Sequence, residues 1–234
     1  MSASRTGGSR ATIRLASYNL RDFLDDRKAA ARVVRALDPD VLCLQEVPRR
    51  LLSTWRVSDF AAECQMYWSG HHRGSGGTTI FTSLRVQAPA STHHRLPVRL
   101  GVRRRGYAVV TVAPPGHLPL TVASVHLSLD GDQRLRHTEQ LLGELPQSGR
   151  SLIAGDLNEG DEGRAYARLA EGHRLVTDGA YTFPATNPDK ALDVVFATPD
   201  VVVRPGRPVP LDEADVRAAS DHRPVWVEVE VTPR

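Results

Sequence analysis

Short apolar segments, most of them ending on a polar or charged side chain, recur along almost the whole chain. Residues 11–20 alternate apolar and polar side chains, whereas residues 41–47 and 151–154 are nearly all apolar. Alternation predicts a strand with one buried face, and a short apolar run predicts a strand buried on both faces. Similar segments follow at 78–83, 105–113, 118–127, 191–197 and 225–231. The chain is therefore expected to be rich in buried strands.

Segments with helical periodicity separate these strands, at 26–37, 51–65, 132–145 and 161–170. Many strands with a few interspersed helices predict two packed sheets with helices on their outer faces. A length of 234 residues suits one domain over residues 11–234. The Ser/Gly/Arg-rich residues 1–10 are expected to be a flexible tail.

Composition says little about a partner. The formal net charge is only +3, so charge alone does not indicate nucleic acid. Cys43 and Cys64 lack metal-type spacing and are interpreted as reduced core residues. The sequence has no apolar leader and no 18-residue apolar stretch, so we expect a cytoplasmic monomer with no membrane partner.

Polar side chains at the predicted strand ends are the main functional signal. If these ends converge on one rim of the sandwich, their side chains share one cleft. The candidates are Asn19, Glu46, His126, Asp156, Asn158, Asp193, Asp221 and His222.

A glycine ends the buried strand at residues 151–154 and is followed by Asp156-Leu157-Asn158. Asp156 could accept a proton from a water that Asn158 orients, or the two residues could simply form an Asx turn. Glu46 follows an apolar strand and could bind Mg²⁺, or it could be a solvated charge. Asn19 is a neutral oxygen ligand or a turn former.

The histidines have similar alternatives. His126 shares a strand face with Val122 and Ser124, as a core residue would, but it could also contact phosphate or protonate a leaving group. Asp221 and His222 are adjacent in an extended segment, so they are expected to serve different partners. Asp193 is a charge in an apolar strand, which favours pairing it with a histidine.

The densest basic cluster is Arg103, Arg104 and Arg105, with a glycine on either side at Gly101 and Gly106. It is either a contact for a phosphate-rich ligand or the solvated end of a hairpin.

Six short motifs, taken in order, resemble the signature of the endonuclease/exonuclease/phosphatase superfamily, which has the DNase I-like fold. The motifs are Ser17-Tyr18-Asn19, Leu44-Gln45-Glu46-Val47, Val125-His126-Leu127, Gly155-Asp156-Leu157-Asn158, Leu192-Asp193 and Ser220-Asp221-His222. The resemblance implies an α+β fold, a four-layer α/β/β/α sandwich of two mixed β-sheets flanked by helices. It also implies Mg²⁺-dependent hydrolysis of a phosphoester, with Mn²⁺ as a substitute.

The resemblance also implies roles for the residues. Glu46 would be the principal metal ligand, with Asn19 and Asp221 as further ligands or phosphate contacts. Asp156 would activate the water, and Asn158 would position it. His222, held by Asp193, would stabilise the phosphoryl oxygens, with His126 on the leaving-group side. The family commonly carries a basic residue at the position of Ala191, and Lys190, one residue before it, either takes over that contact with the substrate or does not. No carboxylate partner for His126 is indicated.

The substrate is left open among the superfamily's phosphoesters, with nucleic acid as one possibility. A phosphodiesterase or nuclease is the first expectation. The alternatives are a phosphomonoesterase acting on a sugar, nucleotide or inositol phosphate, and a catalytically silent binding module with the same fold.

Overall fold

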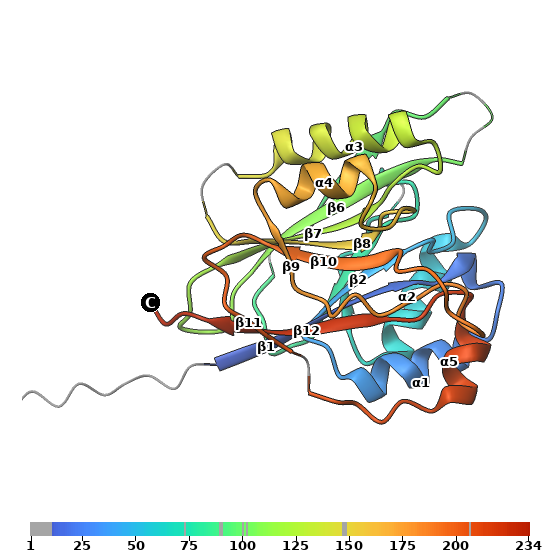
Figure 1. The fold of residues 1–234 in the computed structure, drawn as a ribbon. Coiled ribbons are helices and arrows are strands. Elements are labelled where there is room, and N and C mark those ends of the chain that lie inside the picture. Colours follow the sequence, from blue (N-terminus) through green and yellow to red (C-terminus); the bar gives the residue numbers. More distant parts are fainter. Residues whose placement is uncertain are drawn as a thin grey trace, which may run out of the picture.

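The computed structural model of the protein describes residues 11–72, 74–88, 91–99, 101, 103–146, 149–205 and 207–234. The predicted tail at 1–10 lies outside these residues. Within them the chain forms two mixed sheets packed face to face, with helices on both outer faces (Figure 1). This is the four-layer sandwich that the sequence predicts.

Each sheet contains six strands in the described part of the chain. The first sheet has the order β11-β12-β1-β2-β4-β3, and the second has the order β5-β6-β7-β8-β10-β9. The strands of the first sheet are β1 (Ala11–Asn19), β2 (Val41–Gln45), β3 (Tyr67–Trp68), β4 (Thr79–Thr82), β11 (Val203–Pro205) and β12 (Val225–Val231). The strands of the second are β5 (Thr92–Leu96), β6 (Arg105–Val112), β7 (Leu120–His126), β8 (Ser151–Asp156), β9 (Arg174–Leu175) and β10 (Asp193–Ala197).

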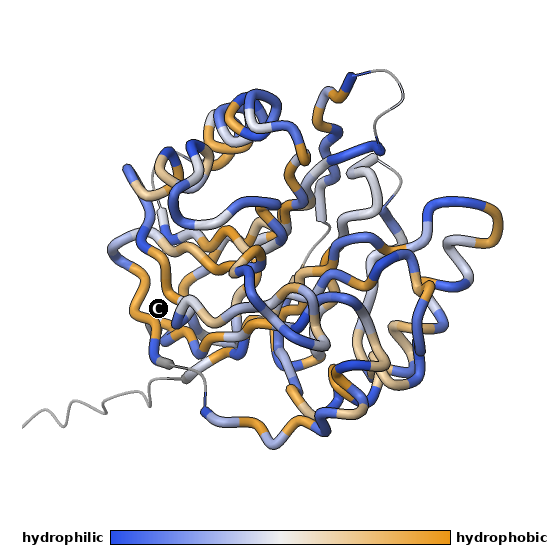
Figure 2. Tube along the Cα trace, turned by 45° about the vertical axis from the view of Figure 1, so that its right-hand side comes forward, coloured by the Kyte–Doolittle hydropathy of each residue, from blue (hydrophilic) through white to orange (hydrophobic). Residues whose placement is uncertain are grey.

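Three layers of apolar side chains hold the sandwich together. The chain trace in Figure 2 is coloured by hydropathy, and hydrophobic positions recur along the packed strands. The middle layer lies between the two sheets and is rich in valine. The first sheet packs its other face against α1 (Arg27–Leu37), α2 (Ser53–Glu63) and α5 (Glu213–Ala219). The second sheet is covered by α3 (Gly131–Glu144) and α4 (Arg164–Ala170). No helix in the described residues is long and apolar enough to cross a membrane.

Local signals explain where the helices begin and end. Asp26 caps α1 by accepting hydrogen bonds from the backbone N–H groups of Lys28 and Ala29. The same helix ends at Asp38, which has a left-handed backbone conformation and precedes Pro39. The helix expected from residue 161 starts only at Arg164, after an irregular segment.

The strand directions bring the candidate residues to one edge of the sandwich. β1 runs parallel to β2, and β7 runs parallel to β8. Asn19 at the end of β1 contacts Asp156 at the end of β8, so all four strands end at the same edge of the sandwich. β10 is antiparallel to β8 and β12 is antiparallel to β1, so both of these begin there.

Gly155 allows β8 to approach β7 closely at this edge. Its φ is +154°, and a Cβ at this position would lie 1.9 Å from the carbonyl oxygen of Val125. Only glycine fits such a contact without moving the backbone. The glycine thus sets the position of Asp156, the next residue.

Candidate active site

Seven of the predicted residues come from both sheets and meet at this edge. Asn19, Glu46, Asp221 and His222 come from the first sheet or the segments that adjoin it, and His126, Asp156 and Asp193 come from the second. Buried ionisable groups require partners, and the contacts between these side chains provide them.

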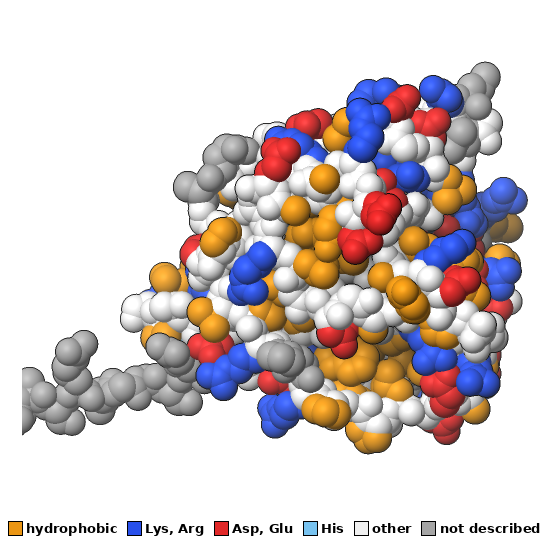
Figure 3. Space-filling view, in the orientation of Figure 1, with side chains coloured by type: hydrophobic (Ala, Val, Ile, Leu, Met, Phe, Trp, Pro, Cys, Tyr) orange, Lys and Arg blue, Asp and Glu red, His pale blue; other side chains and the backbone are white. Residues whose placement is uncertain are grey.

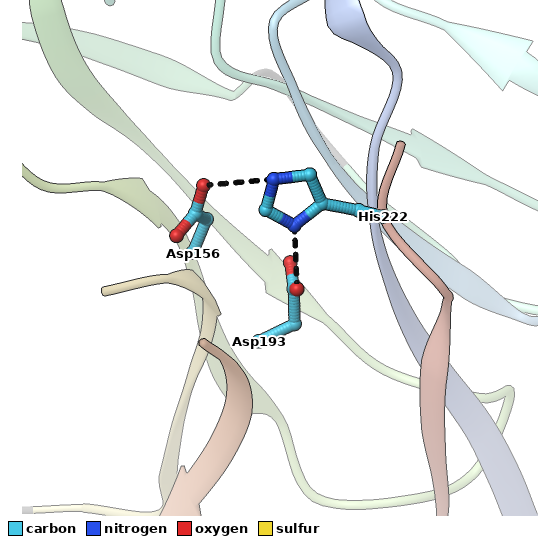
Figure 4. A group of neighbouring side chains, drawn as sticks. All are labelled: Asp156, Asp193 and His222. Carbon is cyan, nitrogen blue, oxygen red and sulfur yellow. Dashed lines mark hydrogen bonds and ion pairs between the residues drawn. The ribbon is translucent and has the colours of Figure 1, made fainter. Parts of the chain in front are cut away.

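His222 lies between two carboxylates (Figure 4). Its Nδ1 is 2.8 Å from Oδ2 of Asp193, and its Nε2 is 3.8 Å from Oδ2 of Asp156. Burial disfavours the charged imidazole, but the carboxylates of Asp193, Asp156 and Asp221 outweigh it and raise the pKa of His222 to about 10. The ring is therefore a cation at neutral pH. The predicted pairing of Asp193 with a histidine is present.

Asp156 is almost completely buried. Its Oδ2 accepts a hydrogen bond of 2.9 Å from Nδ2 of Asn19. Its Oδ1 accepts one of 2.8 Å from the backbone N–H of Asn158, so the Asx turn considered above is also present. Burial and the charge of Asp193 raise the pKa of Asp156 to about 6, against the opposing effect of His222. At neutral pH Asp156 is an ionised carboxylate with the basicity that general-base catalysis needs.

Asn158 has a left-handed backbone conformation, with φ +54°. Its side-chain nitrogen donates to the carbonyl oxygen of Leu127 at 3.0 Å. The side chain is therefore anchored to the loop that follows β7.

His126 ends β7 with its Nε2 3.4 Å from Oδ2 of Asp156 and 3.9 Å from Oε1 of Glu46. These are the carboxylates nearest to it in the described residues, which answers a question that the sequence leaves open. Burial and nearby cations, with Arg105 first among them, hold the pKa of His126 well below its usual range. His126 is therefore neutral, unlike His222.

Glu46 follows β2 with a left-handed backbone conformation, φ +51°. Non-glycine residues rarely adopt this conformation, and those that do are concentrated at functional sites. Nη1 of Arg103 donates to Oε2 of Glu46 at 2.5 Å, and Nη2 of Arg103 contacts Asp22. Sequence reasoning missed Asp22, which lies after β1 in a segment without a recognisable motif.

Asp221 and Lys190 contact residues outside the group around Asp156. Asp221 pairs with Nε of Arg21 at 3.2 Å, so it has a different partner from His222, as predicted. The ammonium group of Lys190 lies 5.8 Å from the ring centre of Phe183, and that ring lies 4.9 Å from the imidazole of His222. Lys190 is thus exposed at the rim, separated from His222 by an aromatic ring.

The three consecutive arginines do not act as one cluster. Arg103 and Arg104 are exposed in the segment before β6, whereas Arg105 is 5% exposed, and its Nε donates to the carbonyl oxygen of Leu127 at 2.9 Å. The prediction treated the run as a single surface feature. The strand begins at Arg105, and the third side chain therefore turns inward.

One group of acids and histidines in the described residues could hold a metal by proximity alone. Asp156, Asp193 and His222 offer ligand atoms that all lie within 4.8 Å of one another. In this group Nδ1 of His222 is already in contact with Asp193. The raised pKa of His222 also keeps the imidazole protonated, and a protonated ring nitrogen has no lone pair for a metal.

The two packed sheets with helices on both outer faces, and acids and histidines at one edge, define the class of fold to which the chain belongs. The chain belongs to the Endonuclease/Exonuclease/phosphatase family, whose model matches residues 16–222. No curated protein matches the sequence.

Solved structures of the family share the architecture. An endonuclease/exonuclease/phosphatase from Beutenbergia cavernae superposes with a TM-score of 0.74 at 22% identity, covering 95% of this chain and 72% of that one. One from Bacteroides vulgatus gives 0.75 at 18% identity, covering 95% and 100%. ANGEL2, described as a 2',3'-cyclic phosphatase, gives 0.72 at 15% identity, covering 94% and 95%. These likenesses concern the fold.

Proposed function

We propose that the protein is a Mg²⁺-dependent phosphodiesterase of the nuclease type. The observation that carries this proposal is the arrangement of one buried carboxylate, Asp156, between a neutral histidine and a charged one. Paired groups whose environments push their pKa values apart are typical of acid–base sites.

Glu46 is the residue best suited to hold the metal, with Asn19 and Asp221 beside the same edge. The carboxylate of Glu46 is partly open to solvent and already accepts a cation, the guanidinium of Arg103. Asp221 is likewise balanced by Arg21. Anionic and amide oxygens are the ligands that Mg²⁺ prefers, so the donor set fits. When bound, Mg²⁺, or Mn²⁺ in its place, would withdraw charge from the phosphoryl oxygens and the leaving alkoxide.

The chain's own residues divide the remaining work. Asp156 accepts a proton from the attacking water, and Asn158 orients that water or the phosphate. The imidazolium of His222, oriented by Asp193, stabilises negative charge on the phosphoryl oxygens. Neutral His126 lies on the leaving-group side. The exposed arginines near Glu46 favour a diester that carries other phosphates over an isolated monoester.

The test compares bis-p-nitrophenyl phosphate with p-nitrophenyl phosphate in Mg²⁺, Mn²⁺ and EDTA. We expect metal-dependent release of p-nitrophenol with a preference for the diester. A monoester preference would identify a phosphomonoesterase. Inactivity on a wider phosphoester panel would identify a silent binding module.

Arg103→Gln should tighten metal binding by about fivefold, because one exposed ion pair contributes at most ~1 kcal/mol and the guanidinium competes for Glu46. Isothermal titration of the free protein with Mn²⁺ measures this without turnover. Arg104→Gln removes a neighbouring charge without removing a contact to Glu46 and is the matched control. Equal affinity in Arg103→Gln and the wild type would contradict the competition.

A further inference from the structure

A cavity of about 730 Å³ adjoins the Glu46 side of the site. Asp22, Leu24 and Pro48 form part of its lining, and five arginines form the rest. We call it the basic cavity, and its arginines are Arg49, Arg50, Arg56, Arg103 and Arg104. Sequence reasoning singled out only the last two.

The basic cavity carries a large excess of positive charge. Five arginines against the single acid Asp22 leave four uncompensated positive charges in its lining. On the face of the molecule drawn in Figure 3, by contrast, acidic side chains lie beside most of the basic ones. In the described residues, Arg103 alone among the five forms an ion pair. Uncompensated guanidinium groups around a cavity attract an anion.

Packing holds two of the arginines in place. The stem of Arg49 lies against Gly77, where a Cβ would come within 2.9 Å of its Cδ. Arg49 is half-buried, and this burial lowers its pKa. The guanidinium of Arg56 lies 5.8 Å from the ring centre of Phe23. These contacts reduce the conformational entropy that the side chains lose when they bind a ligand.

Arg103 connects the basic cavity to the site, because it lines the cavity and also contacts Glu46. A phosphate in the cavity therefore lies next to the phosphate that is cleaved. Guanidinium groups match phosphate oxygens in geometry as well as in charge. Leu24, which is 70% exposed, adds an apolar side chain to the lining of the basic cavity. A sugar or a base can pack against this side chain.

We infer that the basic cavity binds a second phosphate group of the substrate, next to the scissile diester. This inference rests on the proposed phosphodiesterase function and narrows it to substrates with more than one phosphate. Such a phosphate comes from a nucleic-acid strand or from a nucleoside polyphosphate.

Dinucleotides with and without an extra phosphate test the inference. We expect the wild type to cleave pTpT or TpTp with kcat/KM at least about tenfold above that for TpT, since hydrogen bonds between guanidinium and phosphate are charge-assisted and stronger than neutral ones. Arg49→Gln/Arg56→Gln should reduce this ratio to nearly one. Arg136→Gln, on the surface of α3, is the matched control and should keep the wild-type ratio. An unchanged ratio in the double variant would overturn the inference.

A binding measurement separates failure of the inference from failure of the proposed function. A 3'-fluorescein-labelled, 5'-phosphorylated thymidine decamer is titrated in EDTA, and its anisotropy is followed. We expect the double variant to bind about tenfold more weakly than the wild type and Arg136→Gln, with all three unfolding at similar temperatures. Equal binding overturns the second-phosphate site even if diesters are hydrolysed. Weakened binding supports it even if no dinucleotide is cleaved.

Competition then identifies the source of the second phosphate. ATP and an unlabelled, 5'-phosphorylated thymidine decamer are compared as competitors of the labelled strand. Tighter binding of the decamer assigns the cavity to a nucleic-acid strand, and tighter binding of ATP assigns it to a nucleoside polyphosphate. Both outcomes support a phosphate site. Failure of both to compete overturns it.

Discussion

Replacing Asp156 by Asn is expected to lower kcat on a phosphodiester at least ~10²-fold, the usual contribution of a general base. The carboxamide has one oxygen, so it can keep one of the two hydrogen bonds that Asp156 accepts from Asn19 and Asn158, but it cannot accept a proton from water. Steady-state hydrolysis of bis-p-nitrophenyl phosphate in Mg²⁺ measures the loss. A variant with near-normal kcat would exclude Asp156 as the base.

Asp40→Asn is the matched control for this substitution. Asp40 is also buried, but it lies at the opposite end of β2 from Glu46, where it accepts hydrogen bonds from Arg14 and Ser83. This variant should lose stability while its kcat changes little.

The pH profile gives an independent check on the role of Asp156. Its pKa of about 6 means that the base form is lost as pH falls through 6, so wild-type activity should decline on the acid side. The residual activity of Asp156→Asn should lack this acid limb.

Replacing His222 by Gln should lower kcat by ~10²–10³-fold, the usual cost of removing one donor to developing negative charge. Glutamine can donate a hydrogen bond, but it cannot supply the positive charge that Asp193 and Asp156 stabilise on the imidazole. Because the wild-type pKa is about 10, its activity should remain high through neutral pH and decline only in the strongly alkaline range.

Two further variants distinguish catalysis from folding. His137→Gln changes a buried histidine in α3, the helix on the outer face of the second sheet, where it contacts the carbonyl oxygen of Pro97. It should keep its kcat. Asp193→Asn/His222→Gln should lose little more activity than His222→Gln alone, because the two residues act as one unit. Additive losses would mean that Asp193 acts independently of His222.

Hydrophobic patterning predicts most of the strands that form the site. β1, β2, β7, β8, β10 and β12 are buried strands whose apolar residues are evident in the sequence. Short edge strands are different, because β3, β5, β9 and β11 are mostly exposed and polar or only two or three residues long. Such segments become strands through pairing with a neighbour, which a sequence pattern does not contain. α5 was missed because it follows a proline-rich segment.

Some contacts of the candidate site could likewise be predicted from the sequence, and others could not. The contact between Asp193 and His222 could be predicted, because a charge within an apolar strand requires a partner. The contacts of Glu46 with Arg103, and of Arg103 with Asp22, could not. They join three segments whose approach depends on loop conformation. The inward turn of Arg105 depends likewise on where β6 begins.

The candidate site is divided between two sheets of one chain. In this respect it is similar to an active site at a dimer interface, to which each subunit contributes residues. The first sheet and its adjoining segments supply Glu46 and His222, and the second sheet supplies Asp156 and Asp193. Neither sheet alone therefore carries all the residues of the candidate site. The valine-rich layer of side chains between the two sheets holds them together, as an apolar interface holds two subunits. The proposed activity would therefore depend on the alignment of the two sheets, and a slip between them would abolish turnover while each sheet kept its own strands.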